Sequence, residues 1–299
     1  MDKFEMVVQR GGGGRLDSFI ADNMAGHSRS FIQKLIEQNM VSVNDRPAKS
    51  NYKVKKGDRI QAVIPKPQRI TVEAAYIPLD VVYEDGSLIV INKPAGMVVH
   101  PAPGNRTGTL VNALLHHCDS LSEVNDEVRP GIVHRIDKDT TGLLVAAKNE
   151  KVHKHLVRQL KDHSITRKYI ALVKGEIDED GGSIEAPIGR HPTDRKRMAV
   201  VAENSRHAAT HFKVINRFRG YTLMEARLET GRTHQIRVHM HYIGHPVVGD
   251  LKYGRPGNLE VESLMLHAAV LGFIHPEKDK YVEFRAPLPG HFQKVIDSL

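Results

Sequence analysis

The sequence predicts an α+β protein with two domains, a small one at the N-terminus and a larger one built on a mixed, largely antiparallel sheet. The length of 299 residues is more than one ordinary domain needs. Pro65 and Pro67 interrupt the chain, and proline resists both helices and central strands. After them, strand patterns follow one another with helices at irregular intervals, unlike a regular βαβ alternation. We therefore place the domains at 1–66 and 77–299, with a linker at 67–76.

The first domain is expected to contain two helices and a small hairpin. Apolar residues recur at helical spacing over 16–24 and again over 31–36, and Ser28 stands where it can cap the second helix. Apolar and polar residues alternate over 41–43 and 60–64, as is typical of short strands with one buried face. These four elements fit a compact module of about 50 residues.

The second domain is expected to begin with a hairpin whose turn is formed by Asp85 and Gly86. Helical periodicity marks 109–117 and 151–163. The expected strands, in chain order, are 81–83, 88–91, 143–147, 167–174, 208–218, 221–229, 265–273 and 281–285. This succession of strands is what favours a mixed α+β domain.

Composition excludes several classes of protein. The chain is 40% hydrophobic and 26% charged, as folded globular proteins are, and no apolar run reaches the roughly 18 residues of a membrane span. The first ten residues, MDKFEMVVQR, lack the apolar core of a signal peptide, so we expect a cytoplasmic protein that does not engage a membrane. Cys118 is the single cysteine, which rules out an internal disulfide and a CxxC motif.

The charge balance points to a polyanionic partner. The chain has 43 Lys and Arg against 35 Asp and Glu, a net charge of +8, with a pI near 9.4. Residues 1–66 hold 12 of the basic and 7 of the acidic residues, so a net +5 lies in less than a quarter of the chain. Such a local excess favours a salt-sensitive nucleic-acid surface over the alternative, an enzyme that is merely basic.

A polar loop between apolar, strand-like stretches is the most informative part of the sequence. Residues 131–147 place His134, Arg135, Asp137, Lys138 and Asp139 between glycines. Polar loops on rigid scaffolds often carry catalysis, although composition alone favours an ordinary charged connector. Two carboxylates this close in sequence do not indicate the opposed pair of a glycosidase.

A second candidate stretch is 229–241. Read as a helix, it has one apolar face that would pack, formed by Ile236, Met240 and Ile243. The opposite face presents a cation and two imidazoles, His234, Arg237 and His241, although most such faces are simply solvated. A metal site is less well supported, because Gly244 and Pro246 break the helix before His245 and no zinc motif accompanies the histidines.

The loop sequence HRIDKDTTGL, residues 134–143, resembles the signature of the RluA family of RNA pseudouridine synthases. Further stretches match in the family's order, at 89–96, 99–101, 167–169, 229–239 and 245–250. Ile136 departs from the family's usual leucine, which is a volume-conserving change. The resemblance covers 77–299, and residues 14–64 are similar to the S4 RNA-binding module. The bacterial enzymes that act on the helix 69 stem-loop of large-subunit ribosomal RNA are the most similar type.

The resemblance implies an isomerase that converts uridine to pseudouridine in RNA without a cofactor, a metal or a nucleoside triphosphate. By motif position, Asp137 matches the catalytic aspartate, Tyr169 the active-site tyrosine, and Arg237 the arginine that holds the aspartate charged and oriented. Arg135 matches the residue that fills the space left by the extruded uridine. Whether Asp137 attacks C1′, adds to the uracil ring or removes a ribose proton stays open.

Weaker substrate-binding candidates are His134, Arg232 and His234. In the S4-like domain, the expected phosphate contacts are Arg15, Arg29, Lys34, Arg46, Lys53, Lys55, Lys56 and Arg59. The expected partner is ribosomal RNA, free or in an assembling large subunit, and the expected oligomeric state is a monomer. Two alternatives remain: an RNA-binding assembly factor that has lost its chemistry, and a nucleoside hydrolase or glycosidase that acts on small molecules.

Overall fold

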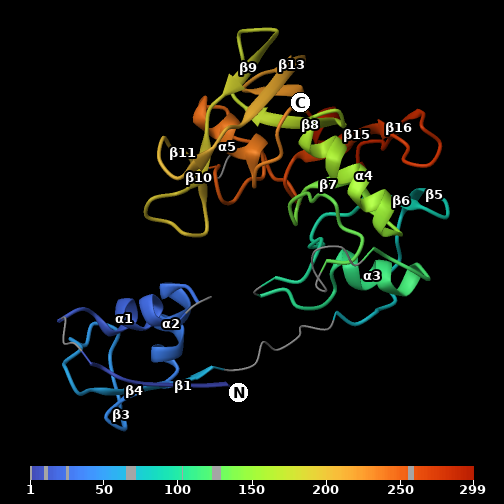
Figure 1. Ribbon diagram of the computed structural model, residues 1–299. Coiled ribbons are helices and arrows are strands. Elements are labelled where there is room, and N and C mark those ends of the chain that lie inside the picture. Colours follow the sequence, from blue (N-terminus) through green and yellow to red (C-terminus); the bar gives the residue numbers. More distant parts are fainter. Residues whose placement is uncertain are drawn as a thin grey trace. The chain divides into compact units, whose positions relative to one another are not determined.

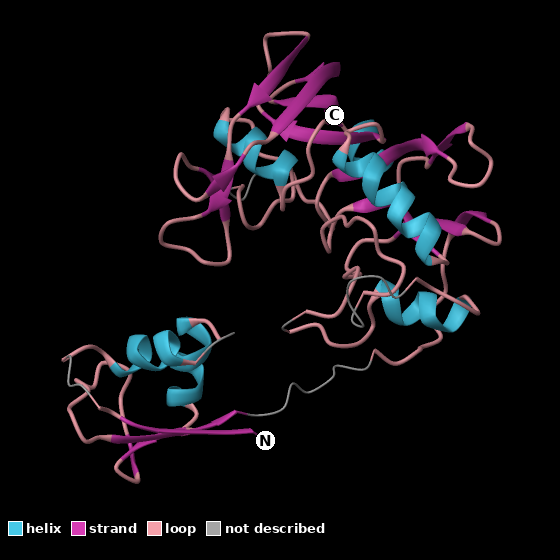
Figure 2. Ribbon diagram, viewed as in Figure 1, coloured by secondary structure: helices cyan, strands magenta, loops and turns pink. Residues whose placement is uncertain are grey.

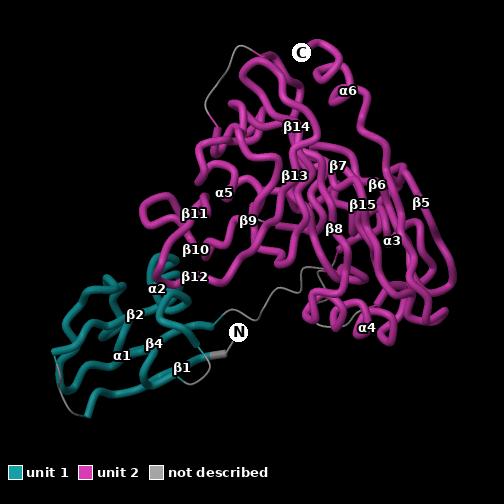
Figure 3. The backbone as a smooth tube through the Cα atoms, turned by 90° about the horizontal axis from the view of Figure 1, so that it is seen from above, with its two compact units in different colours: residues 1–70 teal, residues 71–299 magenta. Residues whose placement is uncertain are grey.

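The computed structural model describes residues 2–9, 13–24, 27–64, 72–102, 104–122, 129–254 and 259–299. The chain divides into two compact units, Met1–Ile70 and Thr71–Leu299, which are considered separately (Figure 3). The two prolines that suggested the linker, and residues 67–71 of the linker itself, lie outside the described residues. Residues 72–80 form neither helix nor strand.

The first unit packs two helices on a four-stranded antiparallel sheet of order β1-β4-β2-β3 (Figure 1). Its elements are β1 (Asp2–Val7), α1 (Leu16–Asn23), α2 (Arg29–Glu37), β2 (Val41–Val43), β3 (Arg46–Pro47) and β4 (Arg59–Ile64). Ser28 caps α2 as predicted, because its Oγ accepts a hydrogen bond of 3.3 Å from the backbone N–H of Phe31. The core lies between helices and sheet and includes Leu16, Ile20 and Ile32.

The second unit is built on one large sheet, and it has more strands than helices (Figure 2). Its elements are β5 (Val81–Glu84), β6 (Leu88–Lys93), α3 (Leu110–His117), β7 (Thr141–Ala147), α4 (Glu150–Lys161), β8 (Thr166–Lys174), β9 (Gly181–Glu185), β10 (Ile188–Arg190), β11 (Met198–Val200), β12 (Ser205–Arg206), β13 (Ala209–Phe218), β14 (Tyr221–Leu228), α5 (Gln235–Tyr242), β15 (Leu266–Ile274), β16 (Tyr281–Arg285) and α6 (Gly290–Asp297).

The strand order of the large sheet is β5-β6-β7-β15-β8-β14-β13-β9, and β16 also pairs with β15. Within the described residues, β7 and β15 form the one parallel pair, and the other neighbouring strands run antiparallel. All seven residues of β7 are buried, and the strand is continuously apolar from Leu143 to Ala147. The predicted α+β class and largely antiparallel sheet are confirmed.

Helices cover both faces of this sheet, which gives the second unit three layers. On one face, α3 and α5 contribute Leu110, Ile236 and Met240 to a core that also contains Tyr169 of β8. On the other face, α4 packs on β6, β7 and β15, and α6 inserts Phe292 against neighbouring strands. Of the face that the sequence predicted to be apolar, Ile236 and Met240 are buried, and Ile243, just after the end of α5, packs partly buried against the same core.

Candidate active site

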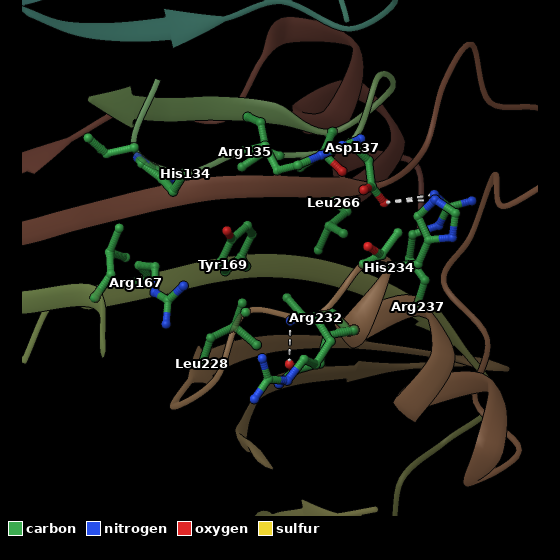
Figure 4. A pocket seen from close by; sticks show the side chains of 18 of the residues that line it. His134, Arg135, Asp137, Arg167, Tyr169, Leu228, Arg232, His234, Arg237 and Leu266 are labelled. Atoms are coloured by element: carbon green, nitrogen blue, oxygen red, sulfur yellow. Dashed lines mark hydrogen bonds and ion pairs between the residues drawn. The ribbon is translucent and has the colours of Figure 1, made fainter. Parts of the chain in front are cut away.

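A cavity of about 550 Å³ lies in the second unit, beside the sheet (Figure 4). Its lining comes from the loop before β7, the C-terminal end of α4, strand β8 and the segment that leads into α5. All the site residues that the sequence predicted in this unit line it: His134, Arg135, Asp137, Tyr169, Arg232, His234 and Arg237. The fold therefore brings together residues that are up to about a hundred positions apart in the chain.

The loop that carries Asp137 is fixed from both sides. Ile136, the adjacent residue, is 5% exposed and belongs to the core beneath the cavity. On the other side, the backbone N–H of Thr140 donates a hydrogen bond of 3.2 Å to the carbonyl oxygen of Asp137. Thr140 is itself buried at the entrance to β7. The carboxylate is thus held on a short, tethered turn, as a preorganised site requires.

Lys93, at the end of β6, ties the same loop to the neighbouring one. Its Nζ donates to the carbonyl oxygens of Pro94 at 2.7 Å, Met97 at 2.9 Å and Lys138 at 3.0 Å. Burial lowers the pKa of this fully buried ammonium to about 8, against the opposing effect of Asp139 and Asp137. Because three carbonyls satisfy its three donors, Lys93 is a structural clamp on the Asp137 loop.

Asp137 is paired with Arg237 of α5. Arg237 Nη1 donates to Asp137 Oδ2 at 2.8 Å, while Nε and Nη2 donate to the two carboxylate oxygens of Asp250 at 2.7 and 2.9 Å. Asp250 is fully buried and also accepts hydrogen bonds from the backbone N–H groups of Lys252 and Tyr253. Asp250 therefore fixes the position of the guanidinium that binds Asp137. Both side chains of the Asp137–Arg237 pair are less than one-fifth exposed.

The pKa values of this network follow from the same contacts. Burial opposes the charge of Arg237, but its bonds to Asp250 and Asp137 outweigh burial and raise the pKa of the guanidinium. For Asp250, burial favours the neutral acid, while the bonds from Arg237 and from two backbone N–H groups bring the pKa below its usual range. Asp250 is consequently a carboxylate and Arg237 a cation at neutral pH.

His234 is the second group near Asp137. It precedes α5 in the left-handed conformation, with φ of +57°, and its Nε2 lies 4.0 Å from Asp137 Oδ2. Its Nδ1 lies 2.7 Å from the hydroxyl of Tyr253, which accepts a hydrogen bond of 2.9 Å from the backbone N–H of Met198. Burial lowers the pKa of His234 to about 4. A neutral imidazole that accepts at Nδ1 from Tyr253 carries its proton on Nε2, facing the carboxylate.

Tyr169 and Arg135 differ in their surroundings. Tyr169 projects from β8 and is 7% exposed, and burial raises the pKa of its phenol, so the hydroxyl is protonated at neutral pH. Arg135 is exposed, and within the described parts of the chain its guanidinium has no hydrogen-bond or ion-pair partner. The buried ring of Tyr169 and the unpaired cation of Arg135 thus line the same cavity as Asp137.

His134 and Arg232 each have a partner in the protein. The Nε2 of His134 accepts a hydrogen bond of 3.1 Å from the backbone N–H of Val145, and burial lowers its pKa to about 3. Arg232 donates from Nε to the carbonyl oxygen of His207 at 2.8 Å. Both side chains still line the cavity, but His134 is a neutral imidazole with one nitrogen engaged.

The other histidines of α5 lie outside the cavity. His241 is exposed and does not line it, so the predicted polar face of the helix contributes His234 and Arg237 to the site without His241. His239 is fully buried, with its ring nitrogens 2.9 Å from Thr210 Oγ1 and from the carbonyl oxygen of Ala186. In the part of the chain that the structure describes, no group of three or more His, Cys, Asp or Glu side chains is placed to hold a metal ion.

Three residues of the site were not identified from the sequence. Asp250 and Arg167 lie in stretches that matched the family pattern, but nothing in the sequence assigned them a partner. Tyr253 contacts His234 and stacks its ring against Arg237, whose guanidinium carbon lies 5.2 Å from the ring centre. The segment after α5 brings Asp250 to Arg237 and Tyr253 to His234, whereas Arg167 lines the cavity from β8.

Among the predicted phosphate contacts of the first unit, some cations have protein partners. Arg15 and Arg29 form ion pairs of 3.0 and 3.1 Å with Asp17, and their side chains remain 42% and 50% exposed. The hydrogen bond from Arg15 is the main reason that the pKa of the buried Asp17 carboxyl lies well below its usual range. Arg59 pairs with Glu5 at 2.7 Å. The remaining predicted cations are exposed: Lys34, Arg46, Lys53, Lys55 and Lys56.

Described helices are all too short or too polar to cross a lipid bilayer.

Comparison with known proteins identifies the family. A family model described as RNA pseudouridylate synthase matches residues 87–242, and one described as S4 domain matches residues 14–60. A Bacillus subtilis protein named as an uncharacterized RNA pseudouridine synthase is 50% identical over 285 residues, which cover 95% of this chain and 94% of the relative. The ribosomal large subunit pseudouridine synthase D of Zymomonas mobilis is 45% identical, with 96% of this chain and 94% of the relative covered.

A solved structure agrees with these matches. Human RNA pseudouridylate synthase domain containing 1 superposes with a TM-score of 0.59 at 28% identity, over 75% of this chain and 87% of that one. The resemblance drawn from the motifs is therefore confirmed, and RNA is the partner of the chain. This chain belongs to the RNA pseudouridylate synthase family and is an isomerase that acts on RNA, with an S4 domain preceding its catalytic domain.

Proposed function

We propose that this enzyme isomerises specific uridines in large-subunit ribosomal RNA, with Asp137 as its catalytic group and without a cofactor. The RNA substrate is supported by relatives named ribosomal large subunit pseudouridine synthase D, which are 44–45% identical over nearly the whole chain. The assignment of Asp137 is supported above all by its 2.8 Å ion pair with Arg237 in a cavity of nucleotide size. We further propose that the enzyme acts in the cytoplasm as a monomer.

The reaction moves the uracil from an N1 to a C5 linkage with C1′ of the ribose. Asp137 presents a carboxylate to the cavity, and Arg237 fixes its orientation while Asp250 anchors Arg237. Such a carboxylate can attack C1′, add to the uracil ring or remove a ribose proton, and each route requires it to be ionised. His234, with its Nε2 at 4.0 Å, is a neutral donor toward the same oxygen.

The target nucleotide must leave its stack before it can enter the cavity. Extrusion costs a few kcal/mol, which contacts to the rest of the RNA have to offset. The exposed cation of Arg135 suits the space that the nucleotide vacates, and the ring of Tyr169 offers a surface on which uracil can stack. The exposed cations of the S4 domain add phosphate contacts that raise affinity without selecting the uridine.

The test compares Asp137→Asn with Asp139→Asn. The first variant keeps the size of the side chain but removes the charge that Arg237 contacts, and the second removes a nearby exposed carboxylate. With ribosomal RNA tritiated at uridine C5, we expect Asp137→Asn to release tritium at least roughly 100-fold more slowly, and Asp139→Asn to behave as the native enzyme. RNA binding, measured by filter retention, should stay nearly unchanged in both.

Several outcomes would reject the proposal. Tritium release that persists in Asp137→Asn would exclude this residue as the catalytic group. RNA binding without any release by the native chain would favour an assembly factor, and free uracil as the product would favour a hydrolase. Pseudouridine mapping of total RNA with and without the gene identifies the target uridines, and their absence from large-subunit ribosomal RNA would overturn the substrate assignment.

A further inference from the structure

Arg167 is a buried cation that lines the active-site cavity and has no assigned role. It lies on β8 two residues before Tyr169, and alternate residues of a strand point to the same side of the sheet. The Cα atoms of the two residues are therefore about 7 Å apart. Figure 4 shows Tyr169 between Arg167 and the Asp137–Arg237 pair. A base that stacks on Tyr169 would accordingly have one edge toward Asp137 and another toward Arg167.

The hydrogen-bonding groups of Arg167 are largely unused. Its side chain is buried, with the residue 8% exposed, and Nη2 donates one hydrogen bond of 3.2 Å to the carbonyl oxygen of Glu229. Its Nε is buried and has no hydrogen-bond partner among the residues that the structure describes. Arg237, at a similar depth, has three bonds to two carboxylates. Burying a cation without such partners lowers the stability of the fold. A ligand that accepts hydrogen bonds from the unused donors would explain why an arginine occupies this position.

Gly231 leaves the space that the guanidinium of Arg167 occupies. A Cβ atom on Gly231 would lie 2.7 Å from Arg167 Nη1, closer than real Cβ contacts occur. The absence of a side chain at this position therefore lets the loop after β14 close over the guanidinium. The backbone of this loop supplies the carbonyl of Glu229 as well, so a single segment fixes the direction in which Arg167 donates.

The cavity lining indicates what Arg167 binds. Asp137 is the one carboxylate among the described residues that line the cavity, and the lining also includes Lys161 and His163. His163 is close to Arg167, because its Nδ1 lies 2.6 Å from the same carbonyl oxygen of Glu229. Because Arg167 is a cation, this part of the cavity suits a hydrogen-bond acceptor or an anion. In an extruded uridine, the phosphates stay with the RNA backbone at the surface, while uracil enters and presents two exocyclic oxygens. Depth in the cavity therefore favours the base.

We propose that Arg167 binds a carbonyl oxygen of the extruded uracil and stabilises the negative charge that the base acquires during the reaction. When the N1–C1′ bond breaks, its electron pair stays with the uracil and spreads over N1 and the carbonyl oxygens. The C5–C1′ bond then forms, C5 loses its proton to solvent, and N1 gains one. A guanidinium on a carbonyl oxygen contributes most between these two steps. This inference rests on the proposed site, in which Tyr169 and Asp137 receive the same nucleotide.

The experiment combines variants of Arg167 with altered substrates. The RNA is a stem-loop that carries the mapped target uridine as uridine, 2-thiouridine or 4-thiouridine, because sulfur is a poor hydrogen-bond acceptor. Arg167→Met is compared with Lys168→Met, which removes the adjacent cation on the opposite face of β8, where it pairs with Glu225 at 3.2 Å. Pseudouridine formation is followed under single-turnover conditions by nucleoside mass spectrometry, and thermal unfolding is measured in parallel.

We expect Arg167→Met to slow formation on the uridine RNA about 100-fold, while the RNA concentration for half-maximal rate stays nearly constant. On one of the two thio RNAs, the same substitution should cost less than about tenfold, because the acceptor is already missing there. Lys168→Met should retain the native rate. The midpoint of unfolding of Arg167→Met should be unchanged or higher, since the variant removes a buried and poorly partnered charge.

A second variant moves the same guanidinium without removing it. Gly231→Ala should displace Arg167 and slow the reaction on the uridine RNA. Its loss of rate should be smaller on the same thio RNA on which Arg167→Met loses less. An equal penalty on all three RNAs, or a native rate in Arg167→Met, would overturn the inference. If Arg167→Met lowers the unfolding midpoint and loses as much activity on the thio RNAs as on the uridine RNA, the role of Arg167 is structural only. If the native enzyme converts none of the RNAs, the proposed function fails instead.

Discussion

The buried pair of Arg237 with Asp250 gives the sharpest prediction about stability. Asp250→Asn keeps the shape of the side chain but replaces a carboxylate oxygen by an NH2 group that faces the guanidinium donors. Asp250 is fully buried and accepts from Arg237 at 2.7 and 2.9 Å, so the substitution leaves a buried cation without its main partner. Breaking one side of such a pair costs about 3–5 kcal/mol.

The assay is thermal and urea unfolding of the full chain. For a unit of this size, 1 kcal/mol shifts the melting temperature by roughly 2–4 °C, so Asp250→Asn should melt roughly 6–20 °C below the native enzyme. The matched control is Asp180→Asn, which breaks an ion pair of the same 2.7 Å length, with Arg217, in which Asp180 is 93% exposed. An exposed pair contributes about 0–1 kcal/mol, so this variant should melt within a few degrees of the native enzyme.

The pH dependence provides an independent check. Because the folded protein lowers the pKa of Asp250, its carboxylate adds stability above the unfolded value of about 3.9, and that stability is lost as the pH falls. The difference in unfolding free energy between the native enzyme and Asp250→Asn should therefore be largest near neutral pH and shrink below about pH 4. A difference that is constant with pH, or equal losses in Asp250→Asn and Asp180→Asn, would refute the reasoning.

Two further predictions concern other parts of the chain. Gly142→Ala should prevent stable folding or lower the melting temperature by more than 10 °C, because φ is +107° there and a Cβ would clash with the carbonyl oxygen of Ala268. The control is Gly220→Ala, where φ is +78° but the space around the residue is open. Similar melting temperatures for the two variants would contradict the steric argument. Deleting residues 1–66 should weaken RNA binding and reduce its salt dependence by about 0.9 per lost phosphate contact. Equal slopes for the full and shortened chains, measured by titration at several salt concentrations, would show that the basic excess of this region does not contact RNA.

Local patterns determined most of the secondary structure. The apolar spacing of residues 31–36 defined α2 and its buried face, and Ser28 marked where it begins. The strand-like stretches 81–83 and 88–91, with the turn residues between them, predicted the hairpin of β5 and β6. These elements depend on neighbours within a few positions, which is the range that periodicity reports. Strands β1, β3 and β9–β12 and helix α6 were not predicted. Strands β1 and β9 pair with β4 and β13, which are distant in the chain, and β3 and β10–β12 are only two or three residues long.

The sequence also predicted several of the residues that line the cavity, because Asp137, Tyr169 and Arg237 each lie within a recognisable motif. It did not determine how those residues are held. The bond of Arg237 to Asp250, the contact of Tyr253 with His234 and the incomplete bonding of Arg167 all join different elements. Only tertiary structure decided them, because hydrogen bonds act over about 3 Å and no sequence pattern specifies which side chains approach that closely after the sheet has formed.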